Sequence, residues 1–380
     1  LRKWASNCSS VLQGVPAEHC VMRLPLQDHL EMDIKLLGVS YNATKDTFSI
    51  QTDATKAAQQ LTKRQLLGEV ARVYDPCGWL APLVVVSKLI LQMLWKEKVA
   101  WDEKVSGDLT SMWNAHRLSY THLDTFDIPR YINLSSLPVI SYTLHGFCDS
   151  SELAYAAVVY VSATADICTT TLLASKTRVA PLKKISVPRL ELCGALLLAQ
   201  LVHELVPTLH VQFTRVYLWS DSTIALHWIA SEPYRWTTFV ANRVTQIQQL
   251  VPDATWKHVR SGDNPADVAS RGLTGDQLIQ CDLWWHGPTW LPDQDSWPNS
   301  TPLLTTSTVP EERSVSTTAA PTVVTSDIIT RYSDYDRLLR ITSYLLRFMK
   351  NCRTSAENRV HGFISVPEMK QALQYWLRSA

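Results

Sequence analysis

Hydrophobic and polar residues alternate through three successive runs between residues 139 and 174. The runs read VISYTLHGFCD, LAYAAVVYVSA and ICTTTLLAS, and short polar turns separate them. Alternation with a period of two places every second side chain on the same face of a β-strand. The pattern therefore predicts an antiparallel meander of three strands.

Helical spacing replaces this alternation further along the chain. Residues 188–206 (PRLELCGALLLAQLVHELV) predict a long helix with a proline near its first turn, and residues 222–230, 236–251 and 264–271 predict three shorter helices. Two more strands are predicted at residues 215–220 (RVYLWS) and 254–259 (ATWKHV). The predicted order is β-β-β-α-β-α-α-β-α, which is typical of an α+β fold with a five-stranded mixed sheet.

A mainly helical region is predicted ahead of this domain. Residues 35–41 (KLLGVSY) and 42–50 (NATKDTFSI) predict two strands joined by a polar turn. A helix follows over residues 62–74, with Thr62 as its N-cap, and the sequence DPCG ends it. Residues 82–98 predict a second amphipathic helix, and the helical pattern continues to Arg130.

Composition and charge separate the C-terminal part from the rest. Residues 299–327 are rich in Ser, Thr and Pro, so we expect a linker there. Residues 276–330 carry one basic and seven acidic side chains (net −6), whereas residues 331–380 carry nine basic and four acidic ones (net +5). The last fifty residues, with amphipathic helices predicted at 335–351 and 367–379, therefore form a separate unit.

The overall composition excludes several classes of protein. The chain has 380 residues, 46% of them hydrophobic, which at about 150 residues per domain predicts two or three domains. The net charge of +1 gives no general attraction to nucleic acid or to acidic membranes. The eight cysteines are scattered singly, which argues against a zinc ribbon or a disulfide scaffold and favours an intracellular compartment.

Targeting and membrane signals are not evident in the sequence. The longest apolar stretch, residues 79–94, is interrupted by Pro82, Ser87 and Lys88, so we expect no membrane partner. The chain begins without an initiator methionine or a signal peptide pattern, which suggests that it is cut from a longer protein.

Four acidic residues fall at the ends of predicted elements of the mixed domain. Asp149 ends the first strand, Glu191 lies in the first turn of the long helix, Asp221 follows the fourth strand and Asp267 opens the last helix. Carboxylates that meet at one point repel each other strongly unless cations neutralise them, and hard oxygen ligands favour Mg²⁺. Two Mg²⁺ ions, with Mn²⁺ as an alternative, would support hydrolysis of a phosphodiester without a covalent intermediate.

Each of these signals also has a purely structural interpretation. Asp221 and Asp267 could simply cap the helices that follow them. Aromatic residues that could stack on bases occupy positions typical of a core; they are Trp219, Trp228, Trp236 and Trp256. Basic residues that could contact phosphates could equally form a solvated loop; they are Lys176, Arg178, Lys183 and Lys184.

Several motifs, in this order, resemble those of one family of mobile elements. HGFCDSSELAYAAVVY, ISVPRLELCGA, WSDSTIALHWI, FVANRV and NPADVASRG are similar to the ribonuclease H domain of BEL/Pao-type retrotransposon polyproteins. LGVSYNATKDTFSI, TKRQLLGEVARVYDPCGWLAPLVVVSKLILQ and WKEKVAWDE resemble the segment that links the polymerase to ribonuclease H in these elements. The resemblance covers roughly residues 1–295, and residues 331–378 resemble the stretch that leads to the integrase.

The resemblance implies a catalytic set and a substrate. The family's D-E-D-D ligands of Mg²⁺ fall on Asp149, Glu191, Asp221 and Asp267. The substrate would be the RNA strand of an RNA/DNA hybrid, cleaved during reverse transcription in a cytoplasmic particle or in the nucleus. Candidate contacts with this substrate are Ser150, Ser222, Lys183, Lys184, Asn242 and Arg243.

The resemblance also implies partners and a domain plan. The partners are an upstream polymerase and a downstream integrase of the same polyprotein. The expected order is polymerase-proximal strands (1–60), a helical connection region (61–135), a ribonuclease H-like domain (139–275), a Trp-rich tail (276–298), a disordered linker (299–330) and a helical lead-in to the integrase (331–380).

Departures from the family leave a second function open. The loop after the fifth strand, residues 259–262, lacks the histidine of cellular ribonucleases H, and the sequence contains no Tyr-x-Asp-Asp polymerase motif. The alternative is a catalytically silent module that binds nucleic acid or acts as a scaffold. Aspartic peptidase activity is disfavoured, because Asp149-Ser150-Ser151 and Asp221-Ser222-Thr223 both lack the glycine that this mechanism needs.

Overall fold

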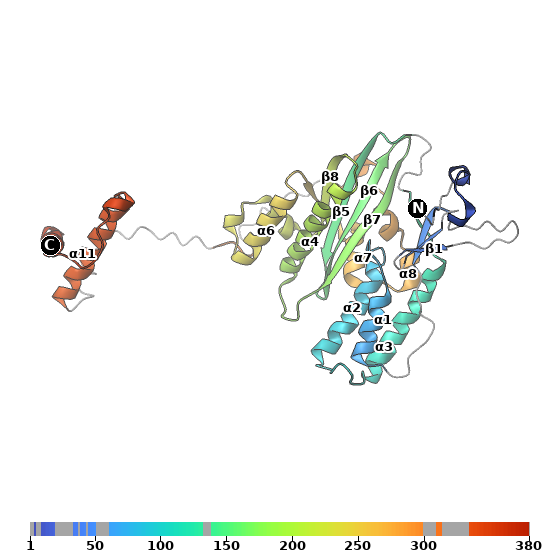
Figure 1. Ribbon diagram of the computed structural model, residues 1–380, viewed down its shortest axis with the longest axis horizontal. Coiled ribbons are helices and arrows are strands. Elements are labelled where there is room, and N and C mark those ends of the chain that lie inside the picture. The colour runs from blue at the N-terminus through green and yellow to red at the C-terminus, as the bar shows by residue number, and fades with distance from the viewer. Residues whose placement is uncertain are drawn as a thin grey trace. The chain divides into compact units, whose positions relative to one another are not determined.

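The structure is a computed structural model that describes residues 4, 9–19, 33–36, 39–42, 45–50, 61–131, 138–298, 309–313 and 334–379. The chain divides into two compact units, Leu1–Arg313 and Ser314–Ala380. Figure 1 shows the elements of both units along the chain. Each unit is described by itself below.

A five-stranded mixed sheet forms the centre of the first unit. The order across the sheet is β7-β6-β5-β8-β9. Its strands are β5 (Ser141–Ser150), β6 (Ala154–Thr164), β7 (Cys168–Val179), β8 (Phe213–Ser220) and β9 (Thr255–His258). The first three strands pair antiparallel, whereas β8 and β9 join parallel to β5 and to each other. The predicted meander and the mixed sheet are confirmed.

Helices cover both faces of this sheet. One face carries α4 (Val187–Thr208), α5 (Thr223–Ala230) and α6 (Thr238–Leu250), and the other carries α7 (Pro265–Arg271), α8 (Gly275–Ile279) and α9 (Asp282–His286). In Figure 1, α4 and α6 lie on the opposite side of the sheet from α7 and α8. The α+β class and the predicted order of elements are thus confirmed.

Strand β6 shows why the sequence builds two layers of core. Ala156, Val158 and Tyr160 face the core of α7–α9, whereas Ala157 and Val159 face the core of α4–α6, and all five are fully buried. Successive side chains of a strand point to opposite faces. A central strand that is covered on both sides therefore reads as a continuous apolar run rather than as an alternating one.

The helical region packs against the sheet domain. It comprises α1 (Lys63–Arg72), α2 (Ala81–Lys96) and α3 (Gly107–Leu118), and Thr62 caps α1 in a capping box with Gln65 as predicted. Leu80 and Leu83, at the start of α2, are buried in the same cluster as Phe147 and Trp219 of the sheet. Leu273 N donates to Pro82 O (3.0 Å), which joins α2 to the chain just after α7.

One predicted strand near the N-terminus is in fact a hairpin. Residues 35–41 were expected to be a single strand, but β1 (Asp33–Leu36) and β2 (Val39–Asn42) pair antiparallel, with Leu36 opposite Val39. Strand β3 (Thr47–Ile50) pairs with β2 and with the two-residue β4 (Ile128–Pro129). The sheet therefore ties the end of the helical region back to the first fifty residues.

The Trp-rich segment is part of the core and not an extended tail. Trp284 is fully buried, and its indole Nε1 donates to Trp79 O (2.9 Å). The Tyr160 hydroxyl donates to Trp284 O (2.7 Å), and Trp297 stacks edge-on against Trp219. An indole ring has large apolar faces and a single N–H donor, so it can be buried once that donor is hydrogen-bonded. The Trp-rich segment therefore covers, together with α7, the same face of the sheet.

By length and composition, one described helix, α4, could cross a membrane. In the structure its inward side chains pack against the sheet, among them Leu192, Ala195 and Leu198, which are fully buried.

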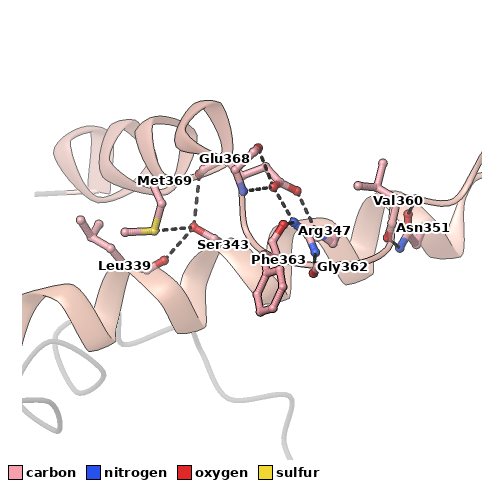
Figure 2. Close-up of polar contacts among 10 residues, drawn as sticks. Leu339, Ser343, Arg347, Asn351, Val360, Gly362, Phe363, Glu368 and Met369 are labelled. Atoms are coloured by element: carbon pink, nitrogen blue, oxygen red, sulfur yellow. Dashed lines mark hydrogen bonds and ion pairs between the residues drawn. The ribbon is translucent and has the colours of Figure 1, made fainter.

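The second unit is a pair of helices, α11 (Tyr335–Cys352) and α12 (Val366–Ser379). Figure 2 shows Arg347 of α11 at the centre of their contact. Its guanidinium donates to both carboxylate oxygens of Glu368 (2.7 and 2.6 Å) and to the carbonyls of Gly362 and Phe363. Glu368 also accepts from the backbone and hydroxyl of Ser365, so one carboxylate both caps α12 and binds α11.

This contact should depend on pH. Hydrogen bonds from Arg347 and Ser365 lower the pKa of Glu368 to about 2 from its usual value of 4.5. A carboxyl whose pKa is lowered by folding stabilises the folded state above the unfolded pKa, and this stabilisation is lost as the pH falls through the folded pKa. We therefore expect amide protection factors in α11 of the full chain to decrease from about pH 5 to about pH 2.

E368Q should lower these protection factors at pH 7 and remove the dependence on pH in that range. E357Q, at an exposed glutamate of the same unit, should retain it. Equal protection of α11 in E368Q and in the unmodified chain at pH 7 would contradict the assignment.

Candidate active site

Two of the candidate carboxylates lie side by side at one edge of the sheet. Strands β5 and β8 run parallel, with Cys148 opposite Ser220. Asp149 is the next residue of β5, and Asp221 directly follows the last residue of β8, so both lie at the carboxyl ends of neighbouring parallel strands. This edge is where α/β sheets generally bind ligands.

Helix α4 brings Glu191 to the same edge. Gly194, one turn after Glu191, packs so closely on β5 that a Cβ atom there would lie 3.0 Å from the carbonyl oxygen of Asp149. Side chains three residues apart share a helix face, so this contact turns Glu191 toward the strand ends. The Ser222 hydroxyl donates a short hydrogen bond to Glu191 Oε2.

Helix α7 supplies the fourth carboxylate from the other face of the sheet. Asn264 Nδ2 donates to Cys148 O (3.0 Å), which fixes the start of α7 against the end of β5. Ser270 Oγ donates to Asp149 Oδ2 (2.5 Å). Asp267 lies between these two contacts along the helix and forms an ion pair with Arg271 (2.6 Å).

Residues other than Asp221 and Asp267 cap the two helices that follow these acids. The N-cap of α5 is Ser222, whose hydroxyl accepts from Ala225 N (3.1 Å), and the N-cap of α7 is Asn264, whose Oδ1 accepts from Ala266 N (3.1 Å). Asp221 and Asp267 are therefore not needed as caps. Asp221 Oδ1 is instead buried without a hydrogen-bond partner among the described residues.

The carboxylates influence one another electrostatically. Burial and the nearby carboxylates of Asp221 and Asp267 raise the pKa of Asp149 to about 7, although the hydrogen bond from Ser270 opposes the shift. Burial, followed by the charge of Asp221, raises the pKa of Glu191 while Ser222 opposes it. Like charges held close together in a partly buried site destabilise the ionised forms, so this edge of the sheet favours a cation.

The four acidic side chains suit a hard divalent cation, because such ions prefer oxygen ligands and all four side chains offer carboxylate oxygens. One of these oxygens, Oδ1 of Asp221, has no hydrogen-bond partner among the described residues. Within the described residues, however, no group of three or more His, Cys, Asp or Glu side chains is arranged to hold a metal ion. Glu191, Asp149 and Asp267 are each engaged by Ser222, Ser270 and Arg271 respectively. Asp149 and Asp221, at the strand ends, are the residues best placed to hold a cation.

The candidate substrate contacts lie in different surroundings. Ser150 ends β5 with its hydroxyl buried and without a partner among the described residues, whereas Lys183 and Lys184 are exposed just before α4. On α6, Asn242 is exposed and the guanidinium of Arg243 lies over the Phe239 ring, 3.5 Å from its centroid. Of the predicted set, Ser222 contacts Glu191 through its hydroxyl, and Ser150 contacts Asp149 through its backbone.

The tryptophans of the sheet domain are core residues rather than surfaces for base stacking. Trp219, Trp228 and Trp236 are fully buried, so they cannot stack on bases, and Trp256 is half-buried. The basic residues Lys176, Arg178, Lys183 and Lys184 are all exposed.

Sequence reasoning missed the residues that hold the acids in place. Ser270 and Asn264 contact β5 across more than a hundred residues of chain, and Gly194 acts through its missing side chain. The Asn-Pro pair at 264–265 was a readable cap signal. Neither Ser270 nor Gly194 carries a local pattern that points to its partner.

Comparison with protein families supports the resemblance drawn from the motifs. The model of the Pao retrotransposon-like RNaseH-like domain matches residues 62–222, which include α1–α3 and the sheet as far as Asp221 and Ser222. The match covers less than half of the chain and shows that residues 62–222 are similar to that family. Comparison with curated proteins gives no match.

Similar solved structures include ribonucleases H and reverse transcriptases. An N-terminal RNase H domain from Mycobacterium tuberculosis shares 18% identity, with 38% of this chain and 98% of that chain covered and a TM-score of 0.26. Foamy viral protease-reverse transcriptase in complex with double-stranded DNA shares 11% identity, with 60% and 38% covered and a TM-score of 0.38. The same viral protein in complex with an RNA/DNA hybrid shares 13% identity, with 60% and 29% covered and a TM-score of 0.37.

The contact between α4 and β5 predicts opposite outcomes for two glycine substitutions. G194A places a methyl group against the backbone carbonyl of Asp149, which cannot swing away, so the free energy of unfolding should fall by about 1–3 kcal/mol. G68A, at an exposed position of α1 with nothing within 4 Å, should raise it by about 0.5–1 kcal/mol.

Chemical denaturation of the full chain measures both values. A G194A chain that matches or exceeds the unmodified chain in stability would show that α4 does not press on Asp149.

Proposed function

We propose that this Pao retrotransposon-like chain is a Mg²⁺-dependent endonuclease that cleaves the RNA strand of RNA/DNA hybrids. The observation that carries the proposal is the meeting of Asp149, Asp221 and Glu191 at the carboxyl ends of β5 and β8, with electrostatic coupling between them. The family match to residues 62–222 supports a ribonuclease H-like origin for this site.

Each acidic residue has a distinct place in the proposed mechanism. Asp149 and Asp221 would hold the cations, and Glu191 and Asp267 would complete the set from α4 and α7. When bound, two such ions lower the pKa of the attacking water and stabilise the leaving oxygen of the phosphodiester. Two Mg²⁺ ions are proposed, with Mn²⁺ as a substitute.

Hydroxyl groups orient two of these carboxylates. Ser222 holds Glu191, and Ser270 holds Asp149. Because each serine is itself fixed at a helix, at the N-cap of α5 and in the last turn of α7, the carboxylates are positioned before substrate arrives. His258 ends β9 opposite Ser220, and the loop that follows, residues 259–262, has no histidine to move a proton, so water or another group would take that role.

Cations near the start of α4 and on α6 suit a nucleic-acid backbone. Lys183 and Lys184 are exposed just before α4, and the partly buried Arg243 lies on α6, which packs on the same face of the sheet as α4. Contacts of this kind bind phosphates without reading the base sequence. The proposed partners are an RNA/DNA hybrid and the polymerase and integrase of the same polyprotein, and the proposed setting is an intracellular particle or the nucleus.

A specific observation favours the second function, a catalytically silent module that binds nucleic acid. The described residues hold no preformed group of three metal ligands, and Arg271 already neutralises Asp267. If the cation site does not form, the same basic surface would still bind a hybrid without cleaving it.

Cleavage of a labelled hybrid separates the two functions. In Mg²⁺ the full chain should cut the RNA strand, and D221N should reduce the rate at least about 100-fold, because a lost metal ligand removes several kcal/mol of charge stabilisation. EDTA should abolish cleavage.

D253N serves as the matched control, because Asp253 is exposed in the turn before β9. Cleavage that is unaffected by D221N, or binding of the hybrid with no cleavage at all in Mg²⁺, would reject the proposed enzyme.

A further inference from the structure

A short acidic segment from the expected linker lies on the sheet domain. Residues 309–313 fall within the range predicted to be disordered, yet they make defined contacts with α4, α5 and α6. Trp228 Nε1 donates to Pro310 O (3.0 Å), Thr237 N donates to Glu311 O (2.9 Å), and Val309 packs against the core of these helices. This segment, residues 309–313, is called the strap below.

The strap places a carboxylate in a site built for an anion. Arg189 donates to both oxygens of Glu311, through Nε (2.8 Å) and Nη2 (2.9 Å). Thr237 Oγ1 adds a third hydrogen bond to Glu311 Oε2 (2.5 Å). Planar, two-point donation by arginine matches the geometry of a phosphate as well as that of a carboxylate.

More cations surround this position. Arg235 forms an ion pair with Glu312 (2.8 Å). The guanidinium groups of Arg189 and Arg243 both lie over the Phe239 ring, 4.8 and 3.5 Å from its centroid. Arg189 of α4, Arg243 of α6 and Arg235, just before α6, thus gather near the strap, which pairs with Arg189 and Arg235.

The strap is held at the same end of α4 as Glu191. Arg189, which holds the strap, lies in the first turn of the helix and precedes Glu191 by two residues. Side chains two residues apart do not face each other, so the strap and Glu191 lie on different sides of this helix end. A hybrid that extends from the carboxylates across this end of α4 would need the position that Glu311 occupies on Arg189.

We propose that residues 309–313 are an autoinhibitory strap, in which Glu311 occupies the position of a backbone phosphate on Arg189 and Thr237, and that nucleic acid must displace it to bind. The inference rests on the proposed nucleic-acid substrate but not on catalysis. The strap is held by its ion pairs, the hydrogen bond from Thr237 Oγ1, two backbone hydrogen bonds, one indole contact and the packing of Val309. The side chains of Glu311 and Glu312 are 18% and 40% exposed, so a polyanion can reach this position and exchange for the strap.

Binding measured without any divalent ion tests the strap. The probe is a short fluorescein-labelled RNA/DNA hybrid, titrated with the full chain in EDTA. E311Q should lower the Kd at least about fivefold, because the unmodified chain spends part of its binding energy on opening the strap. E312Q should also lower the Kd, by a smaller factor. It provides the test of the strap if E311Q does not fold.

The matched control removes the same charge elsewhere. E204Q, at an exposed glutamate of α4 outside the strap contact, should change the Kd by less than about twofold. Hydrogen exchange provides a second measurement, since hybrid binding to the unmodified chain should speed exchange of the Thr237 and Arg313 amides, which bond to the strap or belong to it.

A Kd that E311Q and E312Q leave unchanged or raise, or strap amides that keep their protection in the hybrid complex, would overturn the inference. Absence of hybrid binding by every variant would overturn it as well. A chain that binds more tightly on E311Q substitution but never cleaves in Mg²⁺ would reject the proposed function alone.

Discussion

The parallel pairing of β5 with β8 is the constraint on which the site depends. It sets Asp149 and Asp221 at the same end of two neighbouring strands, whereas antiparallel pairing would place them at opposite ends. The resulting repulsion is tolerated because neighbouring groups offset part of it: Ser270 donates to Asp149, and Ser222 donates to Glu191. Ser222, which caps α5, and Ser270, which belongs to α7, therefore also stabilise the carboxylates of the site.

The helical region supports this arrangement through contacts between α2 and α7. Leu273, just after α7, is bonded to Pro82 of α2, and a Cβ on Gly272 would collide with Val86 of α2. Helix α7, which carries Asp267 and Ser270, is thus pressed between the sheet and α2. Helix α2 also contacts the sheet directly, where Lys88 Nζ donates to Thr177 O of β7 (3.2 Å), and both of these elements lie within the family match to residues 62–222.

Local patterns in the sequence were enough to predict most of the fold, including the order of the elements and the placement of Asp149 and Asp221 at strand ends. They failed where a contact joins distant segments. The strand predicted at 35–41 is a hairpin because Leu36 pairs with Val39, and apolar content alone does not reveal that reversal. Ser270, Gly194 and the strap were missed because their roles exist only once α4, α7 and residues 309–313 lie on the sheet domain.

Crystals of the full chain soaked in Mn²⁺ would test the central claim most directly, since manganese takes the place of magnesium among oxygen ligands and is visible by its anomalous scattering. The strand-end arrangement predicts an anomalous peak bound by carboxylate oxygens of both Asp149 and Asp221, with Glu191 or Asp267 beside it. A map with no peak at these two residues at saturating Mn²⁺, or with the ion bound elsewhere, would contradict it.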